Sequence, residues 1–194
     1  MKRLLICSAL LAVAVSPAFG QMAAPSGSQA TSAKPAPASP AETATATIGG
    51  KNVSISYSSP RVKGREGHIF TKDGLISKNP HYPVWRAGAN GATTLKTEGD
   101  LMLGDLHVPA GTYTLFVDIS DPDNWVLILN KKTGEWGLSY DPSQDLGKVK
   151  MQMGHPEALA ENLTYTITDA GSGKGTITLA WERKQASVSV MVHQ

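Results

Sequence analysis

Apolar side chains recur at every second position through most of the chain after residue 47, and this alternation limits the fold more than any other feature. Val53, Ile55 and Tyr57 alternate with serines. The same pattern returns in four later segments, namely 112–119, 163–167, 177–181 and 188–192. Successive side chains of a β-strand point to opposite faces, so these segments predict strands with one buried face. No window of 11 or more residues carries a helical stripe, which excludes alternating βαβ topology.

Turn-forming residues separate these segments at short intervals. Gly104-Asp105 lies between two short apolar segments, and Gly171-Ser172-Gly173 lies between two longer ones. Residues 125–129 are apolar throughout, as in a strand that is buried on both faces. The pattern predicts an all-β domain over residues 48–194, an antiparallel β-sandwich or jelly roll. Residues 156–161, which begin with proline, predict one short helix.

The first twenty residues have the composition of a secretory signal peptide. Lys2 and Arg3 precede an apolar stretch at 4–15, and Ala18-Phe19-Gly20 supplies the small residues of a cleavage site. We expect cleavage before Gln21 and export to the periplasm or beyond. The apolar stretch is short for a membrane-spanning helix, which needs about 20 residues. No second such stretch follows, so the prediction includes no membrane span after cleavage.

Residues 21–47 consist almost wholly of Ala, Pro, Ser, Thr, Gly and Gln, which predicts a disordered linker. Cys7, the only cysteine, lies in the signal peptide, so the mature chain has no thiol for a disulfide or a metal. Cleavage also removes Lys2 and Arg3, which leaves 16 basic and 16 acidic residues and a formal net charge of zero. A neutral domain lacks the positive field of a nucleic-acid-binding protein.

Basic residues are concentrated in a long segment without alternation, 59–94. Loops of this length inside a compact domain are uncommon and are often functional. Arginine side chains there offer planar donor forks for carboxylate, sulfate or sugar hydroxyls, and a tryptophan offers a stacking face. We predict that a ligand is bound by Lys63, Arg65, Trp85, Arg86 and Asn90. The alternative is structural, with the arginines holding the loop by bonding backbone carbonyls and an internal carboxylate.

Two blocks of sequence in this region resemble an uncharacterised family of exported bacterial proteins that carries a domain-of-unknown-function label. They are Tyr57-Ser58-Ser59-Pro60-Arg61-Val62-Lys63-Gly64-Arg65 and Val84-Trp85-Arg86-Ala87-Gly88-Ala89-Asn90. Later similarities at 109–116, 125–130, 136–137 and 181–182 extend the resemblance over nearly all of residues 48–192. The resemblance implies an exported β domain and supplies no activity. It also implies a glutamate at the position of Gly91 and an arginine near 147–148, so any chemistry of that glutamate would be missing here.

Patterns for metal or covalent chemistry are weak. The five histidines fall in no H-x-H or H-E-x-x-H spacing, and no G-x-S-x-G segment occurs. Asp121-Pro122-Asp123-Asn124 has the composition of a type I turn and lacks the glycine and distal glutamate of a calcium loop. We therefore predict no metal and no cofactor.

The sequence thus predicts an exported, envelope-associated, non-catalytic protein that binds a small polar, anionic or carbohydrate ligand through the basic loop. The alternative is a carbohydrate-active hydrolase or isomerase that uses Asp141, Asp145 or Glu182. Four tryptophans bear on both hypotheses. Trp125 and Trp181 occupy apolar strand positions and are assigned to the core, whereas Trp85 and Trp136 fit either core or ligand contact.

Overall fold

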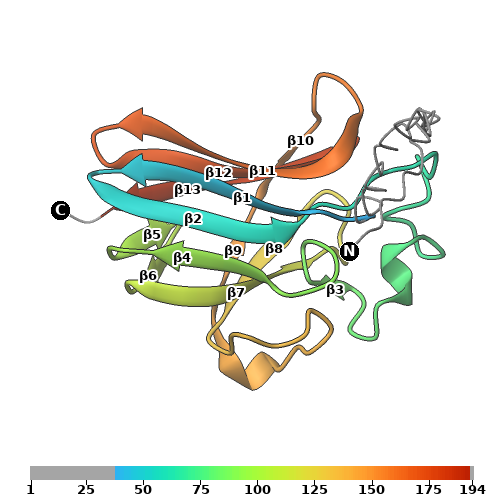
Figure 1. Ribbon diagram of the computed structural model, residues 1–194, viewed down its shortest axis with the longest axis horizontal. Coiled ribbons are helices and arrows are strands. Elements are labelled where there is room, and N and C mark those ends of the chain that lie inside the picture. The colour runs from blue at the N-terminus through green and yellow to red at the C-terminus, as the bar shows by residue number, and fades with distance from the viewer. Residues whose placement is uncertain (1–37, 193–194) are drawn as a thin grey trace, which may run out of the picture. The chain divides into compact units, whose positions relative to one another are not determined.

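A computed structural model of the chain describes residues 38–192, and its ordered elements are almost entirely β-strands (Figure 1). In chain order they are β1 (Ala41–Ile48), β2 (Lys51–Ser58), η1 (Ile76–Lys78), β3 (Val84–Trp85), β4 (Thr93–Thr97), β5 (Leu101–Leu103), β6 (Leu106–Val108), β7 (Gly111–Asp118), β8 (Val126–Asn130), η2 (Pro142–Gln144), β9 (Asp145–Lys150), β10 (Gln152–Gly154), β11 (Ala160–Gly171), β12 (Lys174–Glu182) and β13 (Lys184–Val192). The predicted signal peptide and most of the predicted linker lie outside the described residues. Within residues 38–192, no helix has the length and apolarity needed to cross a bilayer.

The strands form two antiparallel sheets that pack as a sandwich, which confirms the predicted fold class. The first sheet has the order β1-β2-β4-β7-β8-β9, and β3 pairs with the end of β7. The second has the order β11-β12-β13-β5-β6, and β10 pairs with β13. At the two sides of the sandwich, β1 lies beside β11 and β6 lies beside β9.

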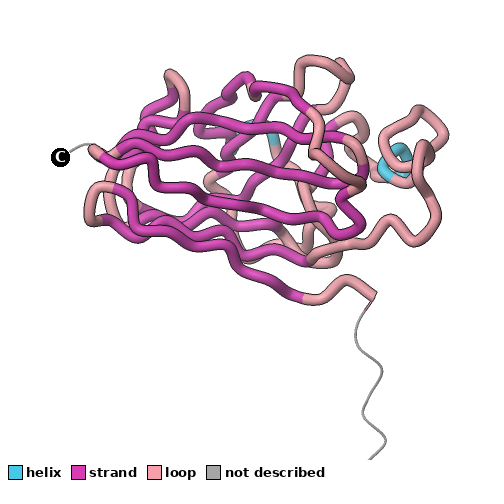
Figure 2. Tube along the Cα trace, turned by 90° about the horizontal axis from the view of Figure 1, so that it is seen from above, coloured by secondary structure: helices cyan, strands magenta, loops and turns pink. Residues whose placement is uncertain are grey.

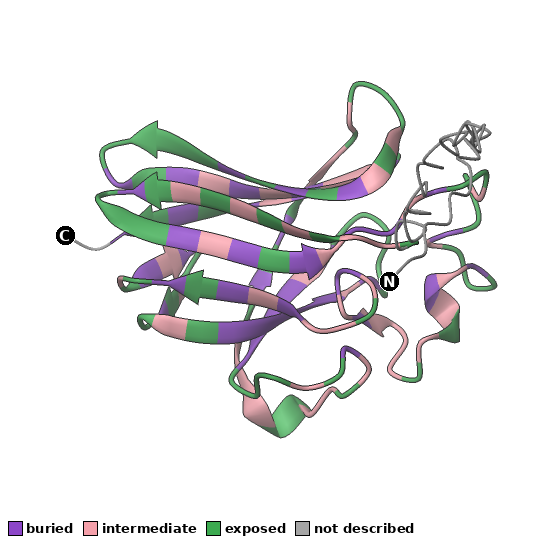
Figure 3. Cartoon of the chain, in the orientation of Figure 1, coloured by how far each residue is buried: buried purple, intermediate pink, exposed green. Residues whose placement is uncertain are grey.

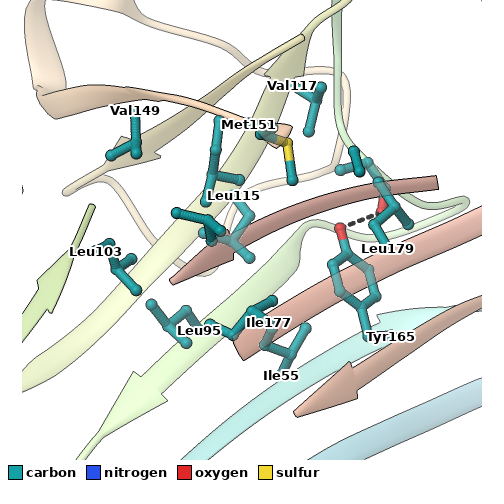
Figure 4. Packing of buried hydrophobic residues seen from close by; sticks show 14 of the residues in the cluster. Ile55, Leu95, Leu103, Leu115, Val117, Val149, Met151, Tyr165, Ile177 and Leu179 are labelled. Carbon is teal, nitrogen blue, oxygen red and sulfur yellow. Dashed lines mark hydrogen bonds between the residues drawn. The ribbon is translucent and has the colours of Figure 1, made fainter. Parts of the chain in front are cut away.

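The core lies between the sheets and is built from the alternate side chains that the sequence pattern singled out. Along β2, buried and more exposed residues alternate (Figure 3). Ile55 and Leu95 of the first sheet lie beside Ile177 of the second (Figure 4). Burying one such side chain contributes about 1.5–3 kcal/mol, so the alternation stabilises this pairing of faces.

The ordered domain begins earlier than predicted, because residues 41–47 are part of β1 and not of a linker. β1 pairs along its whole length with β2, and Ala44 and Ala46 pack against the core. Gly49 and Gly50 join the two strands with φ of 55° and 78°, the left-handed backbone that a two-residue hairpin needs. The small residues of β1 match a linker in composition, whereas their alternation matches an edge strand.

The predicted helix at 156–161 is wrong, because β11 begins at Ala160 and the residues before it form a loop. Backbone hydrogen bonds explain the difference. The Glu161 carbonyl accepts from the Val62 amide at 2.8 Å, and the Leu163 amide donates to the Pro60 carbonyl at 2.9 Å. These long-range bonds hold the segment extended and outweigh its local helix propensity.

An aromatic cluster closes one part of the core and confirms the assignment of Trp125 and Trp181. The Phe70 ring lies 4.9 Å from the Trp125 ring and 5.7 Å from the Trp181 ring, centroid to centroid. Trp85 joins the cluster and stacks on Trp181 at 5.9 Å with an interplanar angle of 22°. Phe70 belongs to the long basic loop, so the cluster ties this loop to both sheets.

Candidate functional site

The long segment predicted as a loop contains only η1 and the two-residue strand β3 as regular elements before β4. In Figures 1 and 2, the part that carries η1 lies beyond one end of the strands, opposite the end at which β13 finishes. Its first residues are held firmly. The Ser59 amide donates to the Pro40 carbonyl at 2.8 Å, and the Ser59 hydroxyl donates to the Leu163 carbonyl at 2.7 Å.

A pocket of about 380 Å³ opens beside this segment. Four of the five predicted site residues line it, namely Lys63, Arg65, Trp85 and Arg86. Leu75, Ile76 and Leu138 supply apolar wall. The volume is within the range that small-molecule sites occupy. The fold therefore brings most of the predicted site together around one concave surface.

The charged side chains that line the pocket among the described residues all carry positive charge. Its basic side chains are Arg61, Lys63, Arg65, Lys78 and Arg86, and no aspartate or glutamate occurs among the described residues that line it. Within the described part of the chain, none of these five side chains forms an ion pair. Clustered cations with low-dielectric walls concentrate a positive potential and attract anions.

Two of the arginines also hold the loop, as the structural alternative predicted. Arg65 donates from Nε to the Val62 carbonyl at 3.0 Å and from Nη2 to the Arg61 carbonyl at 2.6 Å. Arg61 donates from Nη1 to Asn162 Oδ1 at 2.5 Å. Because a guanidinium has five N–H donors, both side chains keep donors beyond these bonds.

Arg86 differs from these two arginines. Among the described residues its side chain makes a single hydrogen bond, and the side chain is partly buried. Its Nη1 donates to the Asn90 carbonyl at 3.2 Å. Burial lowers the pKa of Arg86 by desolvating the charged form. An arginine in a protein nevertheless keeps its proton, so the pocket holds a partly desolvated cation without a carboxylate partner.

Left-handed backbone is concentrated around this pocket. Within residues 38–192, five non-glycine residues have positive φ. Four of them are pocket residues or direct neighbours of pocket residues, namely Lys63 (48°), Ala87 (50°), Asn90 (56°) and Glu182 (58°). The Ala87 carbonyl is fixed by the Tyr165 hydroxyl at 3.0 Å and by the Thr93 hydroxyl at 3.2 Å. Such conformations cost free energy and cluster at functional sites.

The sequence left Trp85 open between core and ligand contact, and its burial favours the core. Trp85 is 3% exposed, and its Nε1 donates to the Gly88 carbonyl at 3.2 Å. Trp181, which also lines the pocket, is 2% exposed. The two rings stack on each other, so they form a floor and present little ring face to a sugar. Trp136, the other open case, is 60% exposed.

Asn90 is the predicted site residue that the structure places outside the pocket lining. Its side chain donates from Nδ2 to the Ser39 carbonyl at 3.2 Å, and its own carbonyl accepts from Arg86. Asn90 therefore positions Arg86 and ties this loop to the segment before β1. Gly137 packs against the same place, since a Cβ there would lie 2.7 Å from Arg86 Cδ and 2.6 Å from the Gly91 carbonyl oxygen.

Sequence reasoning missed several lining residues, including Arg61, Lys78, Leu138 and Trp181. Arg61 and Lys78 lay in the basic segment and carried the same charge signal as Lys63. Leu138 and Trp181 are distant from this segment in sequence, and the alternation pattern assigns Trp181 to the core alone. A residue that belongs to the core and also forms a pocket floor gives no separate sequence signal.

The carboxylates considered for a hydrolase all hold structural contacts. Asp141 accepts from the Ser143 hydroxyl at 2.7 Å and from the Ser143 amide at 3.0 Å at the start of η2, and these two bonds lower the pKa of Asp141. Asp145 accepts from Asn130 Nδ2 at 2.9 Å and from the Tyr140 hydroxyl at 2.8 Å. Glu182 accepts from the Gly67 amide. No cluster of metal-ligating side chains occurs within residues 38–192. Asp121 accepts a hydrogen bond from the backbone amide of Asp123, as an aspartate in a turn does.

Comparison with known proteins finds one matching family model for this chain. A family model described as "Protein of unknown function (DUF2911)" matches residues 39–190. No curated protein and no solved structure matches the chain. The matched region begins two residues before β1 and includes all five basic residues of the pocket.

Proposed function

We propose, from the premise that this chain belongs to the DUF2911 family of proteins of unknown function, that its β-sandwich binds a small anionic ligand in the basic pocket. The observation that carries the proposal is the set of five basic side chains around one cavity, without an acidic lining residue. The contacts of Arg61 and Arg65 with the loop leave Arg86, Lys63 and Lys78 as the side chains most available to a ligand.

The chemistry of these groups narrows the ligand to an oxyanion. A guanidinium binds a carboxylate, phosphate or sulfate through two parallel N–H bonds, and lysines add charge without fixed geometry. Arg86 is partly buried, so an anion that reaches it would pair with a cation that is already desolvated. The apolar wall formed by Leu75, Ile76 and Leu138 favours a ligand with an organic body over a bare ion.

Glucuronate, phosphate and glucose test this proposal when each is added to the wild-type protein during thermal unfolding. We expect glucuronate and phosphate to raise the melting temperature by several degrees at saturating concentration, because a ligand that binds only the folded state stabilises it. Isothermal titration should show an affinity that falls as NaCl is added, since the lysines are exposed and screened by salt. Equal melting temperatures with the two anions, with glucose and with NaCl of matched ionic strength would contradict the proposal.

The proposal extends to the location of the protein. The predicted signal peptide, residues 1–20, supports export, so the pocket would meet ligands of the cell envelope or the surroundings. We expect the protein recovered from producing bacteria to begin at Gln21 and to be found outside the cytoplasmic fraction. Amino-terminal sequencing after fractionation measures both, and an intact Met1 in the cytoplasmic fraction would contradict the expectation.

A further inference from the structure

One buried polar atom of a pocket residue has no hydrogen-bond partner among the described residues. Trp181 lines the pocket, and its Nε1 is the one buried side-chain nitrogen or oxygen within the described residues that lacks a partner. A buried N–H without an acceptor costs free energy, so native structures contain few of them and each needs an explanation.

The neighbouring tryptophan shows that this arrangement is not forced by the packing of the cluster. Trp85 is buried to the same degree, stacks on Trp181 and also lines the pocket. Its Nε1 nevertheless bonds the Gly88 carbonyl at 3.2 Å. The fold therefore supplies an acceptor for the N–H of Trp85 and none for the N–H of Trp181, although both residues line the same pocket.

We propose that Trp181 Nε1 donates a hydrogen bond to a neutral oxygen of the ligand, whose anionic group is bound by Arg86 and the lysines. This inference rests on the proposed function and narrows its ligand class to small organic acids that also carry a hydroxyl, ether or carbonyl oxygen, such as acidic sugars. A fatty acid has a carboxylate for the basic side chains but no oxygen for the indole N–H. A neutral sugar has oxygens for the indole N–H but no negative charge for the basic side chains. A site that bonds a ligand oxygen rejects analogues without that oxygen.

Three probes separate these contributions: glucuronate, which has both groups, hexanoate, which has only the carboxylate, and glucose, which has only the oxygens. We expect glucuronate to bind about tenfold more tightly than hexanoate, as one additional hydrogen bond predicts. In two-dimensional ¹H–¹⁵N spectra, the indole signal of Trp181 should shift with glucuronate and stay in place with hexanoate. The spectrum of Trp181→Phe assigns that signal.

Trp85→Phe is the matched control, because it removes an indole from the same floor whose N–H is already bonded. Trp181→Phe should abolish the preference for glucuronate over hexanoate, and Trp85→Phe should preserve it. If Trp181→Phe fails to fold, single substitutions of the other three tryptophans assign the Trp181 signal by elimination, and its shift in the wild-type protein still decides. Equal affinities of glucuronate and hexanoate with an unmoved Trp181 signal would overturn this inference and leave anion binding intact, whereas no binding of either acid would overturn the proposed function itself.

Discussion

Replacing Arg86 with alanine should weaken the binding of glucuronate or phosphate by about 10- to 150-fold, the effect of removing a charge-assisted hydrogen bond. Arg86 has the largest expected share because it is partly buried and makes a single described bond to a backbone carbonyl. Arg61 and Arg65 divide their donors between the pocket and the loop, so their replacement mixes binding with folding. Isothermal titration of the wild type and of Arg86→Ala measures the difference.

Two further variants make this result interpretable. Arg183→Ala removes an exposed arginine that pairs with Glu66 outside the pocket lining, and it should leave anion affinity unchanged. Gly137→Ala keeps every charge but adds a Cβ that would lie 2.6 Å from the Gly91 carbonyl oxygen and 2.7 Å from Arg86 Cδ, so it should weaken binding by displacing Arg86 together with the backbone that holds it. A folded Arg86→Ala protein with wild-type affinity would contradict the assignment. If Arg86→Ala unfolds and no anion stabilises the wild type, the binding hypothesis also fails.

Replacing Trp125 with alanine should lower the free energy of unfolding by about 3–5 kcal/mol, the cost of truncating a buried aromatic side chain. Trp125 is 2% exposed and packs on Phe70 and Trp85, with centroids 4.9 Å and 6.4 Å away. The variant leaves a cavity under the loop that carries Phe70. Urea denaturation followed by circular dichroism gives the loss, and titration with glucuronate should show weaker binding because the pocket floor has lost its support.

Trp136→Ala is the matched control for this prediction. Trp136 is 60% exposed, and a surface substitution of this kind usually changes stability by less than about 0.5 kcal/mol. A small effect at Trp125 or a large one at Trp136 would show that burial does not determine the stability of this domain.

The strands of the core were predictable from sequence because their alternation has a direct physical cause. The segment 112–119 and the pair of short strands around Gly104-Asp105 appear in the structure as β7 and as β5 and β6. Both errors arose where composition and context conflicted. Residues 41–47 have the small side chains of a linker but pair with β2. Residues 156–161 have helix-forming residues, but 160 and 161 belong to β11, which bonds the segment at 60–62, and the residues before them form a loop.

The pocket was predictable only in part. A sequence shows which residues are charged, but it does not show which side chains the fold brings together. The basic loop indicated Lys63, Arg65 and Arg86, which the fold does bring to one cavity. The sequence also indicated Asn90, whose side chain instead bonds the Ser39 carbonyl. The free indole of Trp181 had no counterpart in the sequence, since the pattern assigns a tryptophan to the core without showing where its nitrogen finds an acceptor.

The closeness of β1 to β11 and of β6 to β9 affects how the protein behaves when it is crowded. An open strand edge is a template on which another chain can add and begin fibre growth. Here each outermost strand of one sheet lies beside an outermost strand of the other, so a chain that adds to either edge must fit beside a second sheet. We therefore expect the packing that closes the core also to restrict how a further strand can add at these edges.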